Sequence, residues 1–120
     1  MLKPIPSRIL RSTATVKVCN GTDLYQHQTY TDYTVSKVHL QPTNEIRKTA
    51  DNTEIVLRSI LFVDARTSAP FLDWYALLQS AHESGGDMLV IVRGQTFTVV
   101  GVDELRDDTD NLHHWEVSLV

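Results

Sequence analysis

The residues best suited to hold a metal ion are two adjacent histidines near the end of the chain, His113 and His114. Neutral imidazole is a common metal ligand. Consecutive residues of a strand point to opposite faces, so two neighbouring histidines in a strand cannot both reach one ion without distortion. No cysteine or carboxylate stands beside them at the spacing of a ligand set. We therefore predict no metal site at these histidines.

Five carboxylates precede these histidines and raise the question of calcium. They are Asp103, Glu104, Asp107, Asp108 and Asp110. A calcium-binding loop has a glycine at its sharp turn and a bidentate glutamate at its end, and this stretch has neither. We interpret the five acids as a solvated charge cluster, and we predict no metal for the chain.

The sequence carries no signature of catalysis. It contains no Gly-x-Ser-x-Gly, no His-Glu-x-x-His and no glycine-rich loop of the kind that holds phosphate. The single cysteine, Cys19, cannot form a disulfide within the chain. It ends an alternating stretch, which favours a packed or half-buried thiol. We predict that the chain is not an enzyme and that it binds no cofactor.

Alternation of apolar and polar residues predicts strands along most of the chain. The expected strands are residues 13–19, 33–41, 55–64, 89–92, 96–102 and 113–119. Residues 55–64 are apolar at nearly every position, which indicates a strand covered on both faces. Turns are expected at Asn20-Gly21 and Arg93-Gly94, and loops at the polar residues 43–54 and 103–111.

One helix is expected over about residues 73–83. Asp73 suits the N-cap position, where its carboxylate can accept a backbone N–H. The residues that follow place one apolar stripe at helical spacing: Trp74, Leu77, Leu78 and Ala81. Gly85-Gly86 supplies the end of the helix. We expect Trp74 to pack against a sheet.

These elements predict a β-rich (α+β) fold, a small β-barrel or rolled antiparallel sheet of about six strands with one short helix. The last strand is expected to close the sheet and so remove an edge. A chain of 120 residues is expected to form a single domain, residues 1–120. Pro4 and Pro6 favour an extended N-terminal arm over residues 1–11.

Charge is distributed unevenly along the chain, whose net charge is −4. This balance argues against a protein that wraps nucleic acid with its whole surface. The first 22 residues carry four basic side chains and no acid, whereas residues 103–116 carry six acids and one base. The asymmetry is either an accident of a solvated surface or the basis of head-to-tail contact between identical subunits. In the second case the contact would join Arg8 and Arg11 to Asp107 and Asp108.

No export or membrane segment is visible in the sequence. The first residues lack the apolar core of a signal peptide, and no stretch approaches the roughly 20 apolar residues that span a bilayer. We expect a soluble protein that is made in the cytoplasm and has no membrane partner.

Three stretches of the sequence resemble the minor capsid proteins of tailed bacteriophages. They are "KPIPSRIL", "GGDMLVIVRGQTFTVVGVDELRDD" and "NLHHWEVSLV". The resembled group contains the head-tail connector proteins, including those of the head-closure or stopper type. The resemblance implies a ring in the neck of the virion, assembled in the host bacterial cytoplasm beneath the portal and adaptor. Such a ring retains packaged DNA and presents a surface to the tail-side neck proteins.

The resemblance also implies which segment lies near the DNA channel. In this family a long inter-strand loop lies there, and residues 43–54 are its counterpart, with Arg47 and Lys48 as candidate channel residues. Acids balance these two cations in the loop, so DNA is expected to be a neighbour only by proximity. Adaptor proteins of the neck are largely helical, and the strand-rich pattern of this chain therefore favours the closure role. The isolated chain is expected to be a monomer or small oligomer.

The alternative is a stand-alone binding module, an SH3-like or OB-like barrel that engages a protein partner. A module for nucleic acid would show exposed aromatics or a basic stripe. The candidate aromatics, Tyr25, Tyr30 and Tyr33, have no lysine or arginine interleaved between them. Nucleic acid is therefore not the expected ligand of such a module.

Overall fold

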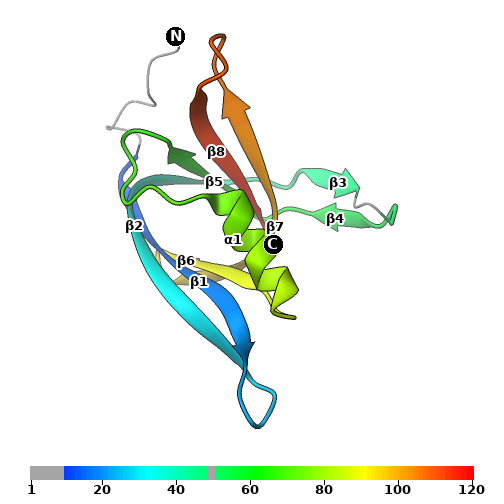
Figure 1. The fold of residues 1–120 in the computed structure, drawn as a ribbon. Coiled ribbons are helices and arrows are strands. Elements are labelled where there is room, and N and C mark those ends of the chain that lie inside the picture. Colours follow the sequence, from blue (N-terminus) through cyan, green and yellow to red (C-terminus); the bar gives the residue numbers. More distant parts are fainter. Residues whose placement is uncertain (1–9, 49–50) are drawn as a thin grey trace.

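The computed structural model describes residues 10–48 and 51–120, and these residues form eight strands and one helix (Figure 1). In chain order they are β1 (Ser12–Thr22), β2 (Gln28–Pro42), β3 (Ile46–Lys48), β4 (Glu54–Val56), β5 (Ser59–Asp64), α1 (Trp74–Glu83), β6 (Met88–Val92), β7 (Gln95–Arg106) and β8 (Leu112–Leu119). The predicted β-rich class with one short helix is confirmed.

Six of the strands form one closed barrel in the order β1-β2-β5-β8-β7-β6, and every pair is antiparallel. β8 pairs with β5 through Val63↔Trp115 and with β7 through Val102↔Val117. The last strand therefore lies between two others and closes the sheet, as the sequence predicts. Closure pairs the backbone of all six strands and leaves the barrel without a free edge.

The core is built by the alternating apolar residues of the barrel strands. In β1 the buried side chains are Ala14, Val16 and Val18, the same face that the alternation predicts. The helix adds Trp74, Leu78 and Ala81 to the same buried cluster. Tyr75 lies on an exposed part of α1, with 55% of its surface accessible.

Helix α1 has the cap at each end that its sequence predicts. Asp73 Oδ1 accepts a hydrogen bond from the Ala76 N–H at 3.1 Å. At the other end, Gly85 takes a φ of +80°, and Gly86 N–H donates to the Ala81 carbonyl at 3.1 Å. A left-handed residue followed by this bond is the Schellman ending, for which glycine is the residue with the lowest strain. The capped helix packs its stripe against β1, β6 and β7.

The turn predicted at Asn20-Gly21 is wrong, because both residues belong to β1. The Asn20 side chain donates to Thr31 Oγ1 at 2.8 Å and accepts from Thr29 Oγ1 at 2.6 Å across the β1–β2 ladder. β1 and β2 stay paired past Asn20-Gly21, and the chain reverses direction only at residues 23–27. At Arg93-Gly94 the predicted hairpin turn is confirmed, with φ of +53° and +75°.

The loop predicted at residues 43–54 is also wrong, because it contains β3 and the start of β4, which pair with each other. The apolar stretch 55–64 is not one strand either. β4 ends at Val56, and β5 begins at Ser59. Leu57, between them, is almost fully buried and turns the chain from the small sheet into the barrel.

β7 runs on to Arg106, so the acidic loop expected at residues 103–111 is the end of a strand followed by a short turn.

Three hairpins project from the barrel in different directions (Figure 1). They are β1–β2 at the bottom of the view, β3–β4 at the right and β7–β8 at the top. Residues 1–9 of the expected arm lie outside the described residues, and Leu10, which follows them, is buried. The three projecting hairpins hold Arg47, Lys48, Asp107 and Asp108 of the candidate residues named from the sequence, whereas Arg11 lies just before β1.

Candidate interaction surfaces

The tip of the β7–β8 hairpin is organised by Asp107. Asp107 Oδ1 accepts hydrogen bonds from Thr109 Oγ1 at 2.7 Å, from Thr109 N–H at 2.9 Å and from Asn111 N–H at 3.1 Å. These hydrogen bonds, with that of the Thr109 hydroxyl the strongest influence, hold the pKa of the Asp107 carboxyl below its ordinary value. The Asp107 carboxylate therefore stabilises its own turn, whereas Asp108 is exposed.

The predicted contact between subunits through Arg8, Arg11, Asp107 and Asp108 stays a prediction. Arg8 lies outside the described residues. Arg11 is exposed immediately before β1, and Asp108 is exposed at the tip of the β7–β8 hairpin. Asp107 is committed to hydrogen bonds within its own loop.

His113 and His114 meet, contrary to the expectation that they point to opposite faces. Their Nδ1 atoms are 2.7 Å apart, and His114 Nε2 lies 3.0 Å from Glu116 Oε2. The β7–β8 register shifts between Leu105 and Arg106, so β8 contains one extra residue at this point. Such a bulge interrupts the alternation of side chains, which brings the two neighbouring rings together. If His114 donates Nε2–H to Glu116, its Nδ1 accepts the proton of His113 Nδ1.

Two histidines and one carboxylate at this bulge do not make a metal site. Glu116 binds the far nitrogen of His114, so it does not converge with the two Nδ1 atoms. Across residues 10–48 and 51–120, no group of three or more His, Cys, Asp or Glu side chains could hold a metal ion. In the same part of the chain, no helix is long and apolar enough to cross a membrane.

The β3–β4 hairpin is attached to the barrel by Arg47. Its guanidinium donates to Ser118 Oγ at 2.8 Å, to Asp103 at 3.3 Å and to Glu45 at 3.2 Å. Partial burial acts to lower the pKa of Arg47, but the hydrogen bonds and negative charges of Glu45 and Asp103 outweigh it and raise the pKa. Lys48, the other candidate channel residue, is exposed. DNA contact by either residue stays a prediction.

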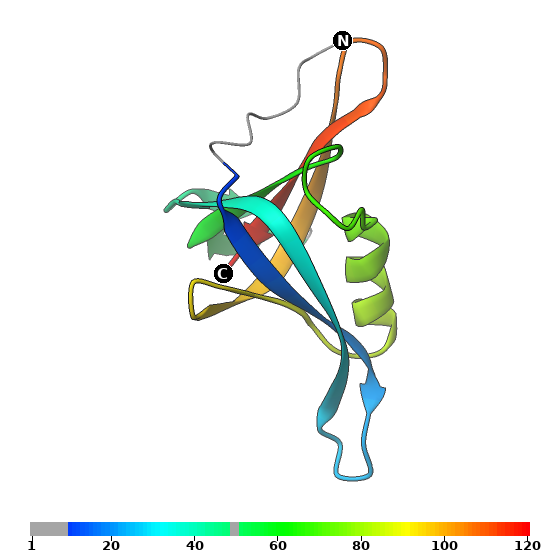
Figure 2. The same cartoon turned by 90° about the vertical axis from the view of Figure 1, so that its left-hand side faces the viewer.

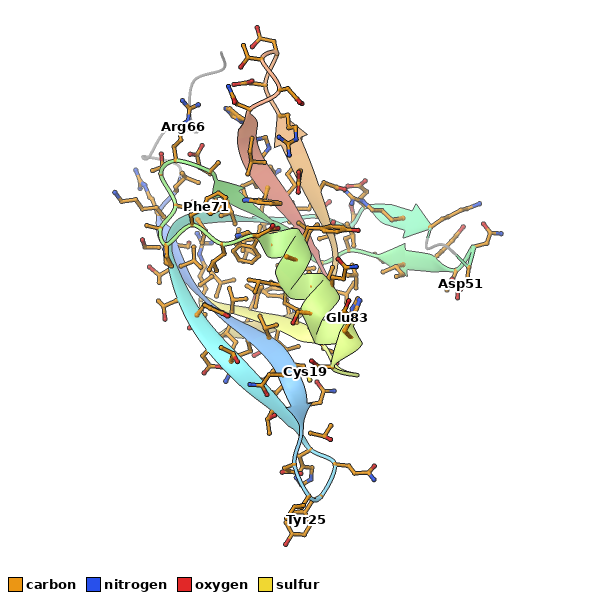
Figure 3. The ribbon with its side chains drawn as sticks, viewed as in Figure 1. Cys19, Tyr25, Asp51, Arg66, Phe71 and Glu83 are labelled. Atoms are coloured by element: carbon orange, nitrogen blue, oxygen red, sulfur yellow. The ribbon has the colours of Figure 1, made fainter. Side chains whose placement is uncertain are left out.

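The β1–β2 hairpin carries an apolar tip that the sequence analysis did not single out. Leu24 and Tyr25 are 99% and 82% exposed, the highest values among the large hydrophobic residues that the structure describes. Figure 3 shows Tyr25 at the far end of the hairpin, pointing away from the barrel. Of the other two candidate aromatics, Tyr30 and Tyr33 pack partly against the core.

A cavity opens on the barrel near the β6–β7 turn. Its volume is about 370 Å³. It is lined by Leu40, Pro42, Arg58, Ser59, Arg93, Gln95 and Phe97. We call these seven residues the barrel mouth. The Arg58 Cζ atom lies over the Phe97 ring, 4.8 Å from the ring centroid, which is a cation–π contact.

Neither the apolar tip nor the barrel mouth follows from residue patterns alone. The sequence places Leu24-Tyr25 just after an aspartate and among polar residues, which is the signal of a turn, but exposure at that turn depends on how far the strands extend. The mouth collects residues of β2, β5 and β7, with Arg58 from the segment before β5 and Arg93 from the β6–β7 turn, which only the closed barrel brings together.

Comparison with families of known proteins gives a match over nearly the whole chain. The model of the family described as Minor capsid protein matches residues 6–119. The chain belongs to the minor capsid protein family. No curated protein matches it.

Membership in this family confirms the resemblance to minor capsid proteins. The minor capsid protein is a structural protein of a phage, and its place is the virion. The family is a structural one and is not known for enzymatic activity.

Proposed function

We propose that this minor capsid protein is a head-tail connector component of the head-closure type. It assembles as a ring beneath the portal and adaptor, retains packaged DNA and allows the tail to join. The observation that carries the proposal is the family match over residues 6–119. The strand-rich fold supports closure over adaptor, since the resemblance implies largely helical adaptors.

Three projecting hairpins support a position between several neighbours. A ring subunit in a neck needs contacts with two identical subunits, with the proteins above it and with those below it. Hairpins that leave the barrel in different directions offer separate surfaces for such partners (Figure 1). A single binding module with one ligand needs only one such surface.

DNA is proposed as a neighbour by proximity and not as a tightly bound ligand. The chain has a net charge of −4. In the candidate channel hairpin, Arg47 is paired with Glu45 and Asp103, and Lys48 stands opposite Glu54 in the β3–β4 ladder. A cation that is already paired with carboxylates, as Arg47 is, releases few counterions when a phosphate approaches, so it adds little affinity.

The experiment is complementation of a phage that lacks this gene. The expected result without the gene is filled heads that leak DNA and fail to join tails, with infectivity restored by the intact gene. Arg11→Glu is expected to reduce tail joining, and Asp108→Arg in the same chain to restore part of it. Asp108 is chosen because Asp107 is needed by its own turn. Sealed and tailed heads in the absence of the gene would end the head-closure proposal.

A further inference from the structure

The apolar tip of the β1–β2 hairpin is a preformed surface. Asp23 Oδ1 accepts from Tyr25 N–H at 2.8 Å and from His27 N–H at 2.9 Å, and Asp23 N–H donates to the His27 carbonyl at 2.9 Å. Gln26 closes the loop in the left-handed region with φ +63°. The loop is thus fixed while Leu24 is 99% exposed and Tyr25, whose ring centroid lies 6.4 Å from that of His27, is 82% exposed. Fixing a loop before it binds lowers the entropy cost of binding.

The barrel mouth has the chemistry to receive such a tip. Leu40, Pro42 and Phe97 make part of it apolar. Arg58 and Arg93 add two exposed cations, and neither forms an ion pair with any other described residue. Arg58 is exposed although its guanidinium lies over the Phe97 ring, so a second aromatic ring can approach the cation from the solvent side.

We propose that the Leu24-Tyr25 tip of one copy inserts into the barrel mouth of a second copy. In this contact Leu24 packs on Leu40 and Pro42, and the Tyr25 ring stacks on Arg58. A buried tyrosine brings a large apolar area and a hydroxyl that needs a polar partner, and Gln95 and Arg93 supply one at the rim. The inference rests on the proposed function, since it describes how the ring subunits meet.

The positions of tip and mouth make this contact a directional one. Figure 2 shows the tip at the lower end of the molecule and the β6–β7 turn, which borders the mouth, at the left. Tip and mouth are therefore different surfaces of the same chain. A contact between two different surfaces leaves one tip and one mouth free in every dimer, and repeated addition then closes into a ring or extends as a filament.

The test is a disulfide between two singly substituted proteins. His27→Cys, which leaves Leu24 and Tyr25 in place, and Gln95→Cys proteins are mixed and mildly oxidised. The matched control mixes His27→Cys with Gln79→Cys, an exposed position on α1. The buried native Cys19 is common to all three proteins. The expected heterodimer forms at least about tenfold faster than the control, because the contact raises the effective concentration of the two thiols. Equal rates would overturn the proposal.

A loop exchange provides a second variant that keeps the backbone. Residues 107–111 form the same loop as residues 23–27: an aspartate accepts from N–H groups two and four residues later, and the fourth residue has φ near +64°. Replacing residues 24–27 with Asp-Thr-Asp-Asn therefore removes the apolar tip and retains the turn.

The loop-exchange protein alone, and the Arg58→Glu protein alone, should remain monomeric in concentrated solution. Their mixture should form a dimer and no larger oligomer, because the Arg58→Glu protein keeps only the tip and the loop-exchange protein keeps only the mouth. Absence of that dimer would contradict the contact.

The outcomes separate this inference from the head-closure proposal. If the loop exchange abolishes complementation while disulfide formation equals the control, the tip binds a different neck protein and the self-contact is wrong. If the gene is dispensable for sealing and tail joining while the disulfide forms as expected, the self-contact stands and the head-closure role is wrong.

Discussion

Single aspartates decide the shape of two of the three hairpins. The carboxylates of Asp23 and Asp107 each accept hydrogen bonds from the backbone N–H groups two and four residues later. The backbone N–H of each aspartate also donates to the carbonyl four residues later. The same frame then presents opposite chemistry, Leu24-Tyr25 in one hairpin and Asp108-Thr109 in the other. Because the framing carboxylate is a structural group, the contacts of each tip depend on the two residues that follow it.

Ionisation of Asp107 should contribute to stability in a pH-dependent way. Its pKa is lower in the folded chain than in the unfolded one, so its contribution is complete above the unfolded value, about 4, and is lost as the pH falls through the lower folded value. Asp107→Asn should therefore lower the thermal midpoint at pH 7, and the difference from the parent should shrink below about pH 3. Thermal unfolding followed by circular dichroism measures both. Asp110→Asn is the control, since Asn tolerates its left-handed φ of +64°. A difference that is constant with pH would contradict this role of the charge.

At the scale of elements, the helix and the barrel depend on each other. Leu78 is 9% exposed within the core cluster, and Tyr75, one turn earlier on α1, is 55% exposed. Leu78→Ala should lower the free energy of unfolding by ~2–5 kcal/mol, and Tyr75→Ala by less than about 1 kcal/mol. Denaturant unfolding of the two proteins gives both values. Equal losses in the two variants would mean that the stripe of α1 does not pack as described.

Elements with a long periodic signal could be predicted, and those set by long-range pairing could not. The four-residue stripe and both caps of α1 are local, so its bounds follow from the sequence. β3 and β4 have three residues each, too few to show a period, and they exist because Ile46 pairs with Val56 and Arg47 reaches the barrel. Likewise, the bulge that joins His113 to His114 depends on the register of β7, which no local pattern reveals.

At the scale of the whole molecule, the structure has an elongated outline of 48 × 32 × 28 Å with a preformed tip and a mouth apart from it. The tip is small. A tyrosine buries about 150–250 Å², so a contact made by one tip falls well short of the roughly 1,200 Å² of stable interfaces. The proposed contact between copies is therefore weak when it acts alone.

Weak pairwise contact predicts that assembly depends on a platform. The isolated protein should sediment as a monomer at micromolar concentration and form small oligomers only when concentrated. In the proposed head-closure role, a portal and adaptor that hold several copies side by side would raise their effective concentration, so that each tip meets a neighbouring mouth without a stronger contact. Purified heads carrying the adaptor should then bind the protein cooperatively, and the loop-exchange variant should bind without cooperativity. Sedimentation velocity and quantitative binding to such heads measure the two states. Stable rings of the isolated protein at low concentration would show that the subunit interface is much larger than the tip.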